Sequence, residues 1–245
     1  MTTALKRPGG ELATRPLHFI WTVDCSTSMR GEKISTVNHA IQSTIPDMRA
    51  ESAQNPNARL LVRTLKFSSG ASWVTADPVP IEEFAWDDLE ASGLTDMGKA
   101  FECLAAQLTI PPMSERALPP VIVLLSDGHP TDSYKKELDR LLALPWGRKA
   151  VRIAISIGKD ADDSVLEEFT GNPELVLQAN NVKTLVKMIK WASTLAGMVS
   201  SPDSKPRAMQ DIVSGRQTIT SNGPMVMKDG NIPTPVPSTG DGDVW

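Results

Sequence analysis

The sequence has 245 residues, of which 40% are hydrophobic, and it carries a formal net charge of -4. A chain of this length and composition can bury a substantial core, so we expect one globular domain with additional terminal segments. The 25 basic residues are scattered among 29 acidic ones, which argues against the basic surface that binds nucleic acid.

The cysteine content and the N-terminal segment both indicate the cellular compartment of the protein. Only two cysteines occur, Cys25 and Cys103, which argues against a disulfide framework or a zinc ribbon and favours a reducing compartment. The first 16 residues contain no apolar segment of signal-peptide length, and no stretch approaches the 18 apolar residues of a membrane span. We therefore expect a cytoplasmic protein without membrane association.

The first half of the chain begins with a flexible polar arm at residues 1–16, rich in proline and glycine, and a strand at 17–24. A helix then follows, because four apolar residues recur at steps of three and four: Ile34, Val37, Ile41 and Ile45. Residues 59–68 and 71–79 are strand-like and are separated by Ser69-Gly70, which predicts an antiparallel hairpin at a sheet edge.

The second half alternates helices and strands. A helix begins near Met97, and the run at 121–125 is so continuously apolar that we expect helices on both faces of this strand. The remaining predicted elements are a helix at 132–144, a strand at 151–157, a helix at 162–170, a strand at 175–178 and a helix at 182–198. This alternation predicts an α/β domain at 17–198: a Rossmann-like, open, mostly parallel six-stranded sheet with one antiparallel edge strand and helices on both faces.

The composition changes after this domain. Residues 199–245 are rich in proline, serine, threonine and glycine and have no helical periodicity, which predicts a mostly extended tail. Two interpretations of the tail remain open. It is either a solvated segment without a role, or it docks on a partner or on the domain through short apolar pieces and the Pro-Thr-Pro-Val-Pro run at 233–237.

Polar side chains gather where the predicted strands end. Asp24, Ser26 and Ser28 occupy alternate positions after the first strand, so their oxygens are able to converge on one point. Thr95 lies in the loop before a helix, and Asp127 ends the most apolar strand. Oxygen ligands suit a hard divalent cation, and ligands of open α/β sheets bind beyond the carboxyl ends of the strands. The simpler alternative is a helix cap built from Asp24 and the serines.

The three segments DCSTS, GLT and SDG resemble the metal-ion-dependent adhesion site of von Willebrand factor type A (VWA) domains. The resemblance implies a VWA fold, with Ser26, Ser28 and Thr95 as direct ligands and with Asp24 and Asp127 bound directly or through water. It implies Mg²⁺ as the cofactor, with Mn²⁺ or Ca²⁺ as alternatives. It also implies a protein partner that supplies an Asp or Glu carboxylate to the cation.

Within VWA proteins, the segments RPLHFIWTVDCSTSM and GLTDMGKAF are similar to the bacterial TerY-like group, which is associated with tellurite resistance. That likeness implies a Ser/Thr kinase and a PP2C-type phosphatase as partners. The resulting hypothesis is a non-catalytic, Mg²⁺-dependent protein-interaction module in stress-response or kinase/phosphatase-linked signalling, with residues 93–97 and 129–131 forming the rim that selects the partner.

Two enzymatic alternatives are weaker. A metal-dependent phosphohydrolase or phosphotransferase would use Asp24 as nucleophile, but Ser26 stands where such families place a second acid. The segment 93–99 fits a phosphate-binding loop, but Ala100 replaces the hydroxyl that would bind Mg²⁺. His129 is expected at the rim, without a nucleophile to activate. Asp96 is either a second-shell residue or a first-turn acid, and we favour the latter.

Overall fold

The computed structural model describes residues 14–55, 57–159, 161–189, 219–220 and 223–224. The elements are β1 (Arg15–Asp24), η1 (Thr27–Met29), α1 (Glu32–Ala53), β2 (Ala58–Ser68), β3 (Gly70–Trp73), β4 (Val79–Pro80), α2 (Met97–Gln107), β5 (Val121–Ser126), α3 (Tyr134–Ala143), α4 (Pro145–Lys149), β6 (Val151–Ile157), α5 (Asp163–Thr170), η2 (Pro173–Leu175), β7 (Val176–Ala179), β8 (Ile219–Thr220) and β9 (Gly223–Pro224). Residues 182–189 are helical as well.

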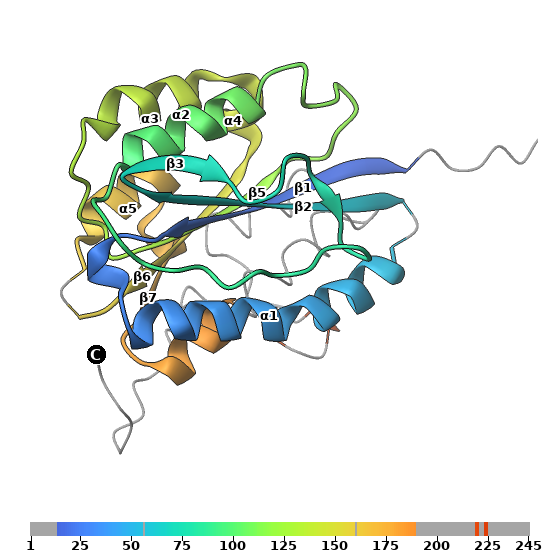
Figure 1. Cartoon of the computed structure of the whole chain (residues 1–245). Coiled ribbons are helices and arrows are strands. Elements are labelled where there is room, and N and C mark those ends of the chain that lie inside the picture. Colours follow the sequence, from blue (N-terminus) through green and yellow to red (C-terminus); the bar gives the residue numbers. More distant parts are fainter. Residues whose placement is uncertain (1–13, 56, 160, 190–218, 221–222, 225–245) are drawn as a thin grey trace, which may run out of the picture.

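The main sheet has the order β3-β2-β1-β5-β6-β7, and its central strands are parallel (Figure 1). The chain starts at β1, adds β2 on one side, and later places β5 on the other side of β1. Strand order therefore reverses between β1 and β5, and the carboxyl ends of these two strands are the expected ligand position in an open α/β sheet. This confirms the predicted mostly parallel α/β class.

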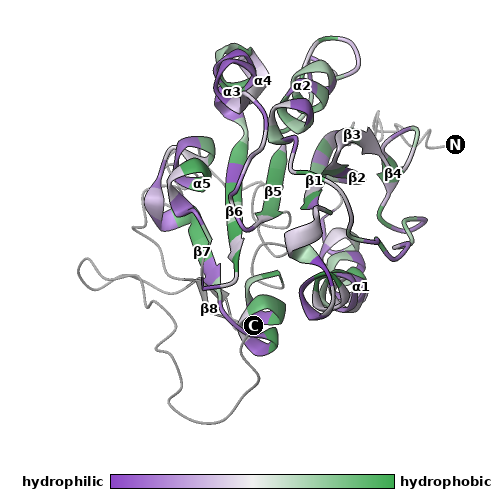
Figure 2. Ribbon diagram, turned by 60° about the vertical axis from the view of Figure 1, so that its left-hand side comes forward, coloured by the Kyte–Doolittle hydropathy of each residue, from purple (hydrophilic) through white to green (hydrophobic). Residues whose placement is uncertain are grey.

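Two apolar layers cover the two faces of the sheet. On one face, α1 and residues 182–189 pack on alternate residues of β1 such as Phe19 and Trp21. On the other face, α2, α3 and α5 pack on Ile20 of β1 and on the intervening residues of β5 and β6. All six residues of β5 are buried, as expected for a strand covered on both sides (Figure 2). The helices on both faces are thus confirmed.

The antiparallel edge is confirmed, but it consists of two short strands, so the sheet has seven strands instead of six. The predicted strand at 71–79 is interrupted because Arg63 of β2 binds its backbone. The Arg63 guanidinium donates from Nε to the Thr75 carbonyl at 3.2 Å and from Nη2 to the Ala76 carbonyl, and it also lies over the Trp73 ring. These contacts draw the segment between β3 and β4 out of the strand ladder.

Several element ends differ from the sequence predictions. The predicted helix at 132–144 is α3, and a further short helix, α4, begins at Pro145, a residue favoured in a first helical turn. The predicted helix at 182–198 is described only to residue 189. The N-terminal arm and the tail lie mostly outside the described residues, and within the tail β8 and β9 form a two-residue antiparallel ladder. No helix among the described residues is long and apolar enough to cross a membrane.

Candidate metal centre

Three loops meet beyond the carboxyl ends of β1 and β5. The first follows β1 and carries Asp24, Ser26 and Ser28; the second precedes α2 and carries Thr95; the third follows β5 and carries Asp127. Four of these five side chains belong to buried residues, and only Ser28 is exposed. Polar side chains collected at one buried edge of a sheet need specific partners, since unpaired buried polar groups are costly.

The loop after β1 brings its own three side chains together. The backbone N–H of Ser26 donates to Asp24 Oδ1 at 2.8 Å, and the hydroxyls of Ser26 and Ser28 lie 3.0 Å apart. The turn of η1 starts directly after Ser26, whose side chain makes no capping hydrogen bond. The helix-cap alternative for this motif is therefore wrong for Ser26, whose Oγ pairs with Ser28 Oγ.

The Asp24 carboxylate is wholly buried and has two hydrogen-bond donors. Oδ1 accepts from Ser26, and Oδ2 accepts from the Ser126 hydroxyl at 2.6 Å. Burial raises the pKa of Asp24 from 3.8 to about 6, against the opposing effect of these hydrogen bonds, and the nearby Asp127 raises the pKa further. A buried carboxylate with a raised pKa is stabilised by any cation that binds beside it.

Asp127 is held by a tight turn against the neighbouring loop. Its carbonyl accepts from the Asp162 N–H at 2.8 Å, and the next residue, Gly128, has φ of +75°. A Cβ on Gly128 would lie 2.2 Å from the Asp162 carbonyl oxygen, so only glycine fits. Asp127 Oδ1 is buried without a hydrogen-bond partner, while Oδ2 lies 3.8 Å from Nζ of Lys33.

The loop that carries Thr95 is fastened to the other two. The backbone N–H and the hydroxyl of Thr27 both donate to the Gly93 carbonyl, at 3.0 and 2.9 Å. The Ser92 N–H donates to the Cys25 carbonyl at 2.6 Å. On the other side, Thr95 exchanges hydrogen bonds with Thr131, through its N–H to the Thr131 hydroxyl and through its carbonyl to the Thr131 N–H. Thr95 is therefore positioned by both neighbouring loops.

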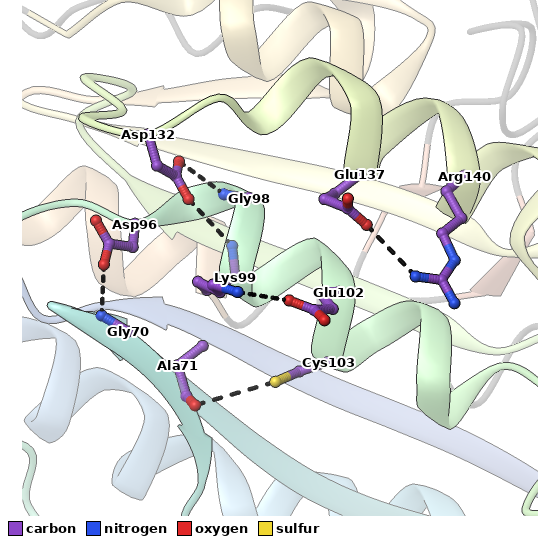
Figure 3. Close-up of polar contacts among 10 residues, drawn as sticks. All are labelled: Gly70, Ala71, Asp96, Gly98, Lys99, Glu102, Cys103, Asp132, Glu137 and Arg140. Atoms are coloured by element: carbon purple, nitrogen blue, oxygen red, sulfur yellow. Dashed lines mark hydrogen bonds and ion pairs between the residues drawn. The ribbon is translucent and has the colours of Figure 1, made fainter.

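The carboxylates of Asp132 and Asp96 also hold the loop that carries Thr95 in place, through hydrogen bonds to backbone N–H groups (Figure 3). Asp132 accepts from the backbone N–H groups of Gly98 and Lys99 in the first turn of α2, at 2.9 and 3.2 Å. Asp96 accepts from the Gly70 N–H at 2.7 Å and from the Thr131 hydroxyl at 3.4 Å. Asp96 itself precedes α2 and makes no capping bond, so the favoured interpretation of it as a first-turn acid is wrong.

The donor set fits a hard divalent cation. It offers a buried unpaired oxygen on Asp127, a buried carboxylate on Asp24 and an adjacent pair of hydroxyls, and oxygen atoms are the ligands that Mg²⁺, Mn²⁺ and Ca²⁺ prefer. Among the described residues there is no cluster of three or more His, Cys, Asp or Glu side chains, so hydroxyls have to complete any coordination shell here. Burial raises the pKa of the Cys25 thiol to about 12, which removes it as a thiolate ligand.

The phosphate-loop interpretation of residues 93–99 is not supported by the geometry. In such loops the N–H groups at the start of the helix remain available for phosphate. Here those of Gly98 and Lys99 are already bound to Asp132. The start of α2 therefore serves to fix Thr95.

Sequence reasoning missed three residues that shape the site: Ser126, which binds Asp24; Asp132, which holds the start of α2; and Lys33, which faces Asp127. Thr131 was predicted at the rim, but its bonds to the Thr95 loop were not. Ser126 carried a signal, since it is a hydroxyl residue at the end of an otherwise apolar strand. Asp132 and Lys33 lie in polar segments, where a single polar residue has no distinctive pattern.

The sequence pattern of the von Willebrand factor type A domain matches residues 20–191, which include all three loops. The chain belongs to this family. No curated protein matches the sequence.

Solved structures similar to this VWA domain agree on the fold at low sequence identity. The ArnB paralog VWA2 from Sulfolobus acidocaldarius has a TM-score of 0.54 and 18% identity, and the match covers 72% of this chain and 44% of that one. The pilus adhesin SpaC from Lactobacillus rhamnosus GG, in its open conformation, has a TM-score of 0.60 and 13% identity, covering 77% and 30%.

A third similar structure is proximal thread matrix protein 1 from the mussel byssus, whose adhesion motif is occupied by zinc. Its TM-score is 0.57 at 16% identity, and the match covers 77% of this chain and 50% of that one. The VWA domain described here thus spans half or less of each of these three relatives. A divalent metal at this edge of the sheet is consistent with the family.

Proposed function

We propose that this protein is a non-catalytic, divalent-cation-dependent interaction module that binds a carboxylate of a partner protein. The proposed ligands are Asp24, Ser26, Ser28, Thr95 and Asp127. The observation that carries the proposal is the unpaired, buried Oδ1 of Asp127 beside a second buried carboxylate and an exposed serine. When bound there, a cation supplies an open coordination position for one further oxygen ligand.

Exposure at the site favours recognition of a macromolecule. The aspartates and Ser26 are buried, whereas Ser28 and Thr27 are exposed, so a partner reaches the cation from the outer side of this loop. Leu94, directly beside Thr95, is 58% exposed although its N–H is fixed by the Ser69 hydroxyl at 3.1 Å. Leu94 is therefore an apolar side chain at the rim that a partner can contact.

Catalysis by Asp24 is the alternative, and its surroundings argue against it. A nucleophilic carboxylate needs a free oxygen that substrate can approach, yet Asp24 has no solvent exposure and both of its oxygens accept hydrogen bonds. We therefore propose that the protein is not an enzyme.

Other parts of the hypothesis rest on the sequence alone. These are the TerY-like assignment, the link to tellurite resistance and stress response, the kinase and PP2C-type phosphatase partners, and a cytoplasmic location. The choice of Mg²⁺ rests on the resemblance of the motif to the adhesion site of VWA domains, with Mn²⁺ and Ca²⁺ as the alternatives, since oxygen ligands suit all three ions. The absence of nucleic-acid and membrane partners remains part of the proposal.

Metal titration of the full chain tests the proposal directly. Calorimetry with Mg²⁺ and Mn²⁺ is expected to give one saturable site in the parent protein. Asp127→Ala and Ser26→Ala should weaken that site at least tenfold, because each removes one proposed ligand. Ser43→Ala, which alters a hydroxyl that bonds within α1, serves as the matched control and should leave the affinity unchanged.

Partner capture then tests the interaction role. Proteins retained by the immobilised parent chain in Mg²⁺ should be released by EDTA and should not be retained by Ser26→Ala. If the same proteins are retained in EDTA and by Ser26→Ala, the interface is not bridged by a metal ion. Phosphate release from a generic phosphomonoester that disappears in Asp24→Ala would favour the enzymatic alternative.

A further inference from the structure

Lys33 is a cationic residue at the N-terminal end of a helix, where negatively charged residues are usually preferred. It lies in the first turn of α1, where the helix macrodipole favours anions and disfavours a cation. Its side chain is only 13% exposed, and Nζ approaches Asp127 Oδ2 at 3.8 Å. Within the part of the chain that the structure describes, no other ion pair reaches a carboxylate of the metal centre. A departure from local rules at a candidate site indicates a function.

We infer that Lys33 is a built-in countercharge that weakens divalent-cation binding at Asp127 and strengthens binding of an anionic partner group to the loaded centre. This inference rests on the proposed function and specifies the partner's contribution as a single carboxylate. The argument comes from the charges that the fold places together.

The charge balance can be followed through each state of the site. The formal charges of Asp24, Asp127 and Lys33 sum to one negative charge, so a divalent cation would leave the loaded site with one positive charge. One carboxylate from a partner then neutralises it. Without Lys33, the two aspartates alone would balance the cation, and the loaded site would hold no excess charge to attract a carboxylate.

The position of Lys33 allows both effects. The pair with Asp127 is at the outer range of an ion pair and leaves Oδ1 of the same carboxylate without a partner. The ammonium would therefore lie close to a cation held by Asp127, while Oδ1 of that carboxylate stays available. In a largely buried setting, two like charges repel more strongly than they do in water. Lys33 thus raises the free energy of the loaded site, and a partner's carboxylate lowers it again.

The test compares three forms of the full chain: the parent, Lys33→Met, which keeps the length of the side chain, and Lys33→Arg, which keeps its charge. Lys135→Met controls for the loss of one positive charge, because Lys135 is 71% exposed and pairs with Glu168 on the surface. Mg²⁺ and Mn²⁺ affinities are measured by calorimetry. Acetate is the carboxylate probe, and its binding to the Mn²⁺-loaded protein is followed by loss of the water-proton relaxation enhancement. Unfolding midpoints in EDTA verify that each variant is folded.

Lys33→Met is expected to bind Mg²⁺ at least tenfold more tightly than the parent, equivalent to about 1.4 kcal/mol, and to bind acetate at least tenfold more weakly. Lys33→Arg and Lys135→Met should stay within threefold of the parent in both measurements. A folded Lys33→Met with parental or weaker metal affinity overturns the inference while the proposed function stands. A parent chain with no saturable metal site overturns both.

Discussion

The substitution Asp24→Asn measures how much the ionised, buried Asp24 carboxylate destabilises the folded state. Burial and Asp127 raise the pKa of Asp24 from 3.8 to about 6. At 1.36 kcal/mol per pH unit, ionised Asp24 opposes folding of the metal-free chain by about 3 kcal/mol at neutral pH. The folded state binds the proton more tightly than the unfolded state, so stability is full below pH 3.8 and falls as the pH rises towards about 6.

The buried His18 makes stability depend on pH in the opposite direction. Burial, with a smaller effect of the Arg63 charge, lowers the pKa of His18 from 6.5 to about 4. The unfolded state therefore binds the His18 proton more tightly, and stability falls as the pH drops from 6.5 through about 4. In the metal-free parent the two dependences oppose one another, so we expect a shallow stability profile between about pH 4 and pH 6.

The substitution Asp24→Asn removes the pH dependence of stability that comes from Asp24 and keeps the one that comes from His18. The difference in unfolding free energy, variant minus parent, should rise by about 2–3 kcal/mol from pH 4 to pH 7, whatever constant cost arises from the altered bond to Ser126. The variant alone should then become acid-sensitive through His18. Urea unfolding in EDTA, followed by tryptophan fluorescence at closely spaced pH values, measures the difference. A difference that is independent of pH, or that falls towards pH 7, would refute the reasoning.

Five further variants test how the loops are held and whether Leu94 contacts a partner. Gly128→Ala should cost at least about 2 kcal/mol by thermal unfolding, since it adds a Cβ against a carbonyl oxygen; Gly31→Ala, with the same φ of +75° but open space, should cost only the backbone strain of about 1 kcal/mol. Asp132→Ala should destabilise the domain by about 1–2 kcal/mol and weaken metal binding in the same preparation, because α2 loses its only described side-chain acceptor for the first-turn N–H groups. Leu94→Ala should leave the melting temperature unchanged and weaken partner capture, whereas Ile110→Ala, similarly exposed at 53%, should change neither.

The local parts of this site were readable from the sequence. Asp24 ends β1 and Asp127 follows β5, so their positions in the chain place them at the same edge of the sheet. The period-two argument for Ser26 and Ser28 was wrong, because the strand ends at Asp24 and Ser28 lies in the turn of η1. The alternation of helices and strands predicted the mostly parallel α/β sheet, whereas the order of its strands is known only from the structure. The family motif added Thr95, whose loop has no distinctive pattern of its own.

The contacts between loops were not readable. Ser126 reaches Asp24 across 102 residues, and Asp132 reaches Gly98 across 34, so no local pattern reports which side chain will face which. The same holds for Arg63, whose guanidinium divides the predicted edge strand by binding carbonyls 12 and 13 residues away. Periodicity describes the face of an element, whereas these bonds depend on what the fold places opposite to it.

The burial of Cys25 has a practical consequence for studying the site. Its thiol lies between two proposed ligands, is 3% exposed, and has a pKa raised to about 12 by burial and by Asp24, so alkylating reagents meet neither an accessible nor an ionised sulfur. Cys103 is more exposed and lies on α2, and so provides an internal comparison. Modification of Cys25 therefore requires the loop after β1 to detach. The rate at which Cys25 is labelled in the native protein thus reports the rate of local opening of the metal centre.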